Sequence, residues 1–136
     1  MKHLIFLSFI LFTLLACKKI VDKAKDDALT NTITSGQWKM ISFMKGTSDV
    51  TSDFNPYLFK FLANHTVNAI KDGSVEINGS WQTDIQARTI TSFFNNPPYP
   101  INFLNGTWSV LDSGENYVIA TQTVNGEDWK LRLERQ

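Results

Sequence analysis

The stretch Trp129-Lys130-Leu131-Arg132-Leu133-Glu134 decides the fold class of this chain, because large apolar residues alternate in it with charged ones. The same period of two recurs in Trp81-Gln82-Thr83-Asp84-Ile85-Gln86 and, around Lys60, in Tyr57-Leu58-Phe59-Lys60-Phe61. Alternation of this kind is typical of a β-strand with one face buried and the other in water. The sequence therefore predicts an all-β domain of antiparallel strands.

Pairs of residues that favour tight turns separate the alternating stretches. They are Lys45-Gly46, Asp72-Gly73, Asn78-Gly79, Asn105-Gly106, Ser113-Gly114 and Asn125-Gly126. The resulting pattern predicts eight strands, at residues 36–44, 57–62, 66–71, 79–86, 88–93, 105–111, 116–124 and 128–135. Sequential hairpins form an up-and-down antiparallel β-barrel or a β-sandwich. We favour the eight-stranded barrel, because closure removes the exposed edge that the last strand would otherwise form.

The beginning of the chain has the pattern of a secretory signal peptide, with Lys2 followed by an apolar run from Leu4 to Leu15. This run is too short for a permanent span, because a bilayer core of ~30 Å needs about 20 helical residues. We predict a signal peptide at residues 1–16, a tether at 17–35 and the barrel domain at 36–136. Charges of both signs follow one another in the tether, which fits a short helix or a solvated coil.

Composition excludes several classes of function. The 13 basic and 13 acidic residues balance, so nothing resembles the basic surface that nucleic-acid binding requires. Cys17 is the only cysteine, and beyond the predicted signal peptide His65 is the only histidine, which leaves no set for a disulfide, a zinc site or a His-based triad. Asp49 and Asp53 lie in one loop but lack the closing glutamate of a calcium loop. We expect no enzyme, no metal and no cofactor.

Two resemblances to known families add to this interpretation. The segment Leu14-Leu15-Ala16-Cys17 resembles the lipobox of bacterial lipoproteins. That resemblance implies cleavage before Cys17, a diacylglyceryl group on its thiol and an acylated N-terminus, for example with palmitate. It also implies a lipid anchor in the outer membrane of the cell envelope, on either the periplasmic or the surface face.

The domain resembles the lipocalin-like domain lipoproteins of Gram-negative bacteria. The matching motifs are Gly36-x-Trp38, Tyr57-x-Phe59-x-Phe61 leading to Thr66-Val67, Gly79-x-Trp81, the run from Leu104 to Leu111, and Trp129-x-Leu131-x-Leu133. This resemblance implies a small barrel with an internal cavity and a binding role, and it supplies no catalytic residues.

Six aromatic and aliphatic residues are the candidate ligand contacts. Phe59, Phe61 and Ile85 are expected to point inward from strands. Phe94, Tyr99 and Phe103 belong to the proline-stiffened stretch 93–103, which forms either a lid over the barrel mouth or a connection packed onto its end. Four tryptophans follow glycines and fit either ligand stacking or, as we favour, a core plug at one end; they are Trp38, Trp81, Trp108 and Trp129.

Two functions remain open at this point. The first is a membrane-anchored monomer that binds a small apolar or amphipathic ligand inside the barrel. The second is a solid barrel whose loops at 47–56 and 93–103 bind a protein or a glycan of the envelope. The interior volume of the folded domain separates the two.

Overall fold

A computed structural model describes residues 23–136 of the chain, and the predicted signal peptide and Cys17 lie outside the described residues. After a helix at residues 23–33, the chain forms strands with two short 3-10 helices among them. The elements are β1 (Trp38–Lys45), β2 (Ser48–Asp49), η1 (Thr51–Phe54), β3 (Tyr57–Phe61), β4 (Thr66–Lys71), β5 (Ser74–Asp84), β6 (Thr89–Phe94), η2 (Ile101–Leu104), β7 (Gly106–Ser113), β8 (Tyr117–Val124) and β9 (Glu127–Arg135).

The sheet closes on itself as a barrel of eight antiparallel strands. Strands β3 to β9 pair in sequence order, and β1 joins the two edges by pairing with both β3 and β9. The β1–β9 ladder runs from Trp38 opposite Arg135 to Lys45 opposite Trp129. The two residues of β2 only extend one side of β1. The predicted barrel is confirmed, and the sandwich alternative is wrong because no pair of separate sheets remains.

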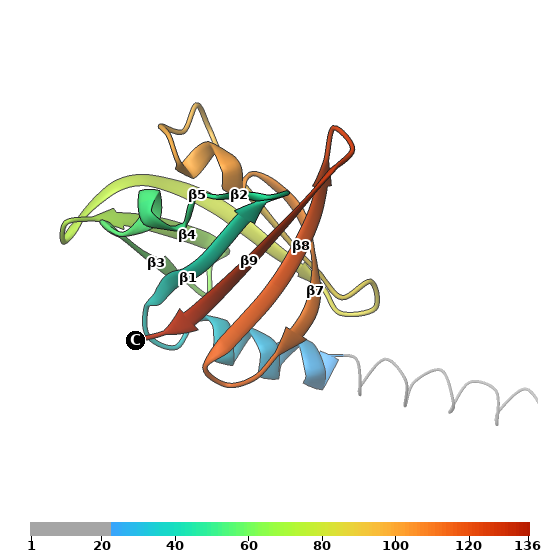
Figure 1. Cartoon of the computed structure of the whole chain (residues 1–136). Coiled ribbons are helices and arrows are strands. Elements are labelled where there is room, and N and C mark those ends of the chain that lie inside the picture. The colour runs from blue at the N-terminus through green and yellow to red at the C-terminus, as the bar shows by residue number, and fades with distance from the viewer. Residues whose placement is uncertain (1–22) are drawn as a thin grey trace, which may run out of the picture.

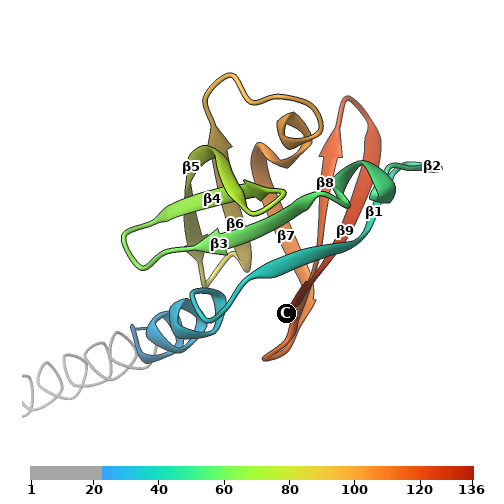
Figure 2. The same cartoon turned by 90° about the vertical axis from the view of Figure 1, so that its left-hand side faces the viewer.

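The connections between strands alternate between the two ends of the barrel, which gives each end its own character (Figures 1 and 2). One end carries the helix 23–33, the turns at 62–65, 85–88 and 114–116, and the C-terminus. We call it the helix end. The other, the loop end, carries η1, η2 and the turns at 72–73 and 125–126.

Aromatic rings fill the loop end. Phe43 and Phe54 are fully buried and stack with ring centroids 5.2 Å apart, and Trp108 meets Phe43 edge-on at 5.7 Å. Ile101 of η2 is also fully buried. Rings packed at these distances leave no passage for a ligand, so the loop end is a solid plug.

The helix 23–33 resolves the choice between helix and coil for the part of the tether that the structure describes. Leu29 and Ile33 are four residues apart and share one face of the helix, which lies against the barrel. Ile33 is 3% exposed, and its carbonyl accepts a hydrogen bond of 2.9 Å from Trp38 Nε1. The packed unit therefore begins before residue 36, because these apolar side chains close the helix end.

Two sequence-based expectations differ from the structure. Gly79 lies within β5, where it pairs with Phe94 of β6, rather than in a turn. A glycine is required there because a Cβ atom would come within 2.7 Å of the Phe94 ring. The tryptophans do not gather at one end: Trp38 and Trp129 lie at opposite ends of the β1–β9 ladder. The physical reason is that successive hairpin turns alternate between the ends of an up-and-down barrel.

Candidate functional site

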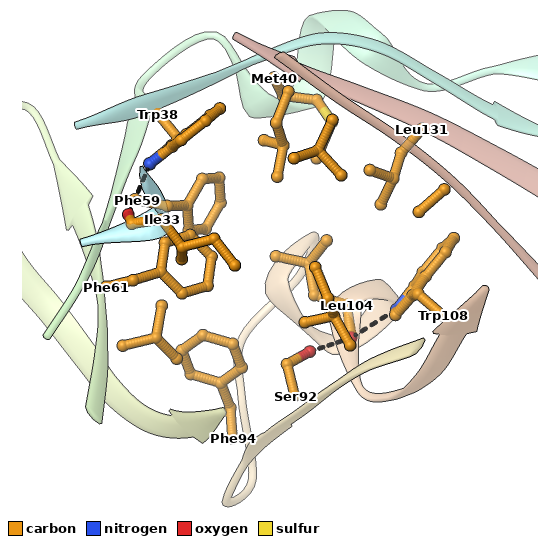
Figure 3. Close-up of a pocket in the computed structure, with 15 residues that line it drawn as sticks. Ile33, Trp38, Met40, Phe59, Phe61, Ser92, Phe94, Leu104, Trp108 and Leu131 are labelled. Carbon is orange, nitrogen blue, oxygen red and sulfur yellow. Dashed lines mark hydrogen bonds between the residues drawn. The ribbon is translucent and has the colours of Figure 1, made fainter. Parts of the chain in front are cut away.

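The interior of the barrel holds a cavity of about 70 Å³ (Figure 3). Side chains from the helix, from η2 and from seven strands surround it. They are Ile33, Trp38, Met40, Phe59, Phe61, Val67, Ile90, Ser92, Phe94, Leu104, Trp108, Val118, Ala120, Leu131 and Leu133. Since every side chain in this lining is apolar or small, the cavity follows from the period of two in the sequence.

The polar atoms in the cavity wall are already hydrogen-bonded within the protein. Leu104 O accepts hydrogen bonds from Ser92 Oγ and from Trp108 Nε1, the latter at 3.0 Å. Trp38 Nε1 donates to the carbonyl of Ile33, as described above. With these donors satisfied, the cavity favours apolar atoms over water, because a buried water needs two to four polar partners.

The size of the cavity limits what enters it. Pockets for drug-sized ligands start at about 300 Å³, and an apolar cavity of about 150 Å³ accepts a benzene ring. A volume of about 70 Å³ suits a narrow apolar group instead. The closed barrel thus has room for the end of a chain and not for a broad ring system.

A groove of about 210 Å³ adjoins the cavity at the helix end. Leu29 of the helix forms one wall of this groove, and Ile85 and Val110 contribute to the barrel side. Ile90 and Val118 line both the groove and the cavity, so these two side chains lie between the two spaces. Asp84 and Arg88 bring one charge of each sign to the groove.

The structure divides the six predicted ligand contacts between three places. Phe59, Phe61 and Phe94 line the cavity together, whereas Ile85 lies in the groove. Tyr99 and Phe103 lie at the loop end, outside the cavity.

The separation of Tyr99 and Phe103 from the cavity has a clear structural cause. Tyr99 is 59% exposed, and its hydroxyl donates a hydrogen bond to Asp53 of η1. The Phe103 ring packs against Trp129, and Lys45 Nζ lies 4.0 Å from its centroid. These contacts hold the stretch 93–103 on the loop end as a packed cover, while Leu104, just beyond it, reaches the cavity.

Several cavity residues were not predicted as ligand contacts. Ile33 is absent from the predicted contacts because the sequence assigns residues 17–35 to a tether, although the i, i+4 spacing of Leu29 and Ile33 indicates a packed helix face. Trp38 and Trp108 were predicted to be core residues, and they are 1% and 4% exposed. They also line the cavity, because a core residue beside a void has a free face.

The ionisable groups lie outside the cavity. In the described part of the chain no group of three or more histidine, cysteine, aspartate or glutamate side chains is placed to hold a metal ion. Asp49 accepts hydrogen bonds from Thr51 N and Thr51 Oγ1, and these bonds lower the pKa of its carboxyl group. His65 lies in the 62–65 turn with its ring 5.1 Å from that of Trp81. These groups serve local structure.

Tyr57 makes stability depend on pH in the alkaline range. Burial and the hydrogen bond that its hydroxyl donates to Glu76 raise the pKa of Tyr57 from 10.0 to about 12. Between these values the unfolded state has already lost a proton that the folded state keeps, so the free energy of unfolding falls as pH rises. We expect a loss of at most about 1.4 kcal/mol per pH unit in this window.

The check is a series of urea titrations from about pH 9 to about pH 12, with Tyr57→Phe beside the wild type. The variant is expected to show a shallower decline, because it has no proton to lose at this position. Tyr99→Phe is the matched control: the pKa of Tyr99 is also raised by its bond to Asp53, but its ring is exposed. Equal slopes for wild type and Tyr57→Phe would contradict the assignment.

The closed antiparallel barrel with a helix across one end has a lipocalin-like fold. The sequence matches no family model and no curated protein. Among solved structures, a DUF4847 family protein from Bacteroides vulgatus is similar, with a TM-score of 0.57 and 16% identity over 79% of this chain and 97% of that one.

A second similar structure is a lipocalin-like protein from Bacteroides uniformis. Its TM-score is 0.53 and its identity 15%, over 76% of this chain and 98% of that one. At such identities the likeness establishes the fold alone. Over residues 23–136, the structure has no helix with both the length and the apolar character needed to span a membrane.

Proposed function

We propose that this protein is a lipid-anchored, lipocalin-like barrel of the bacterial cell envelope that binds a small apolar or amphipathic ligand. The observation that carries the proposal is the cavity of about 70 Å³ with its apolar lining and internally satisfied polar atoms. Binding of an apolar ligand in such a cavity is favourable, because burial of apolar surface lowers the free energy by roughly 25 cal/mol per Å². The lining favours binding over catalysis, because its one side-chain hydroxyl, Ser92 Oγ, already donates a hydrogen bond to Leu104 O.

A quenching titration tests this function. The probe is dodecanol with a bromine on its last carbon, because bromine quenches the fluorescence of a tryptophan that it touches and Trp38 and Trp108 line the cavity. We expect saturable quenching at one site per protein. A titration with no saturable quenching, at probe concentrations below its solubility limit, would contradict the ligand-binding function.

The anchor is proposed on the sequence Leu14-Leu15-Ala16-Cys17. Cys17→Ser removes the thiol that would carry the diacylglyceryl group, so we expect the variant to leave the membrane fraction and to lose labelling with radioactive palmitate. The folded barrel is expected to keep its melting temperature, because Cys17 precedes the described domain. Wild-type protein without label, or Cys17→Ser protein still bound to membranes, would argue against the anchor.

A second candidate function is an interaction surface at the loop end. Two aromatic side chains of the stretch 93–103 are largely exposed, Tyr99 at 59% and Phe93 at 58%. The hydrogen bond from the Tyr99 hydroxyl to Asp53 holds the Tyr99 ring in place. A fixed, exposed ring suits stacking on a sugar or packing against a protein. Under this alternative, Tyr99→Ala abolishes binding to isolated envelope glycans or proteins, and Ala120→Leu in the cavity leaves it unchanged.

A further inference from the structure

The two ends of the barrel differ in how firmly they close the cavity. At the loop end, Phe43, Phe54 and Ile101 are all fully buried and the rings are in contact. At the helix end, Ile90 and Val118 form the wall that the cavity shares with the groove, and Ile33 of the helix lines the cavity beside them. Ile90 is only half-buried. A ligand therefore meets the thinner barrier at the helix end.

The helix 23–33 is held unevenly. Its last turn is fixed, because Ile33 is buried and its carbonyl bonds to Trp38 Nε1. Its first turns are mostly exposed, and a hydrogen bond of 3.2 Å from Thr83 Oγ1 to Asp26 Oδ1 joins them to the barrel. This bond is partly buried, and a hydrogen bond to a charged group contributes about 1.5–3 kcal/mol. The first turns can thus lift at a cost of a few kcal/mol while the last turn stays in place.

The shapes of the groove and the cavity identify the kind of ligand. The two volumes, about 210 and about 70 Å³, together still fall short of the ~300 Å³ of a typical drug-sized pocket. Space in two neighbouring narrow parts suits one unbranched alkyl chain better than a sterol or a fused ring. Asp84 and Arg88 border the groove, where they can meet a polar head that carries both charges.

The position of the predicted lipid anchor indicates that the membrane supplies this alkyl chain. Cys17 precedes the first described helical residue by six positions, a span of at most about 20 Å even when fully extended. An anchor at Cys17 therefore keeps the helix end, and not the loop end, beside the membrane surface. The groove then faces a surface that consists of alkyl chains with polar heads.

We infer that the ligand is the alkyl chain of a single-chain membrane lipid, and that it enters the barrel at the helix end beneath a lid formed by the first turns of the helix 23–33. This inference rests on the proposed function, since it names the ligand class and the entry route of the same cavity. Lifting the first turns of the helix moves Leu29 off the groove while Ile33 stays in place, so that the chain passes Ile90 and Val118 into the cavity.

A reversible crosslink tests the lid. Asp26→Cys and Thr83→Cys, placed together in the Cys17→Ser protein, replace two side chains that already meet at 3.2 Å and leave no other thiol. Oxidation ties the first turns of the helix to β5, and reduction frees them in the same sample. The probes are the terminally brominated dodecanol and a lysophosphatidylcholine whose acyl chain carries the same bromine.

We expect both probes to quench the tryptophans of the reduced protein, and the oxidised protein to bind them at least about tenfold more weakly or more slowly. Equal binding by the two forms would overturn the lid and leave the ligand-binding function standing. Binding of the alcohol but not of the lysolipid would overturn the lipid as ligand. No binding of either probe by the Cys17→Ser protein, whose lid carries no crosslink, would contradict the proposed function itself.

Leu29→Ala supplies a second measurement that needs no crosslink. It removes an apolar contact of the lid with the barrel and leaves the lining of the cavity intact. We expect a faster association of the brominated alcohol in stopped-flow quenching. An association rate equal to that of the wild type would speak against a lid held by this contact.

Discussion

Replacing Trp81 by alanine is expected to lower the free energy of unfolding by about 3–5 kcal/mol, the range for deleting a large aromatic side chain from a core. Trp81 is 1% exposed, and the Phe61 ring meets it edge-on at 5.7 Å. Its Nε1 atom lies 3.1 Å from both Leu62 O and Thr66 O, which closes the 62–65 turn. The substitution therefore removes packing and a buried donor together.

Urea denaturation followed by circular dichroism measures this loss. Trp81→Phe keeps an aromatic ring and removes the N–H donor, so its effect is expected to be intermediate. Trp129→Ala is the matched control: Trp129 is only half-buried and bonds to the exposed Glu127 side chain, and we expect less than half the loss. A larger loss for Trp129→Ala than for Trp81→Ala would refute this account of the core.

Ala120→Leu is expected to weaken binding of the brominated alcohol by at least about tenfold. Ala120 is 2% exposed and lines the cavity, so three added carbon atoms occupy the space that the chain would enter. Each methylene group excluded from burial costs about 0.8 kcal/mol. Exclusion of two or more therefore weakens binding by at least about tenfold.

The same substitution should leave the barrel folded, because the new side chain fills an existing void instead of displacing packed atoms. We expect the free energy of unfolding to change by less than about 1.5 kcal/mol in either direction. Ala63→Leu, at an exposed position in the 62–65 turn, makes the same chemical change away from the cavity and should bind normally. Unimpaired binding by a folded Ala120→Leu protein would place the ligand elsewhere.

The strands were predictable because each depends on short-range patterns. Residues 128–134 alternate charged and apolar side chains, and Asp72 and Asn125 each precede a glycine in a turn where both residues have positive φ. Gly79 was misread because Asn-Gly has the same appearance in a turn and beneath a large ring. Only the position of Phe94 across the β5–β6 pair distinguishes the two cases.

The site was predictable in part. Phe59 and Phe61 followed from strand alternation, and Phe94 reaches the cavity from the end of β6. The position of the Tyr99 side chain depends on a hydrogen bond to Asp53, which is 46 positions away in the sequence. No local sequence pattern predicts that hydrogen bond. The size of the cavity is a small difference between the volume that fifteen side chains enclose and the volume that they fill. No local sequence pattern reveals this difference in volume.

The most direct test of ligand binding in this barrel is a crystal structure of the protein soaked with the brominated dodecanol, with the bromine located by its anomalous signal. We predict a bromine peak inside the cavity between Trp38 and Trp108, with the chain leading past Ile90 toward the groove at the helix end. A bromine peak at the loop end beside Tyr99, or an empty cavity in a crystal that holds the probe elsewhere, would contradict the account.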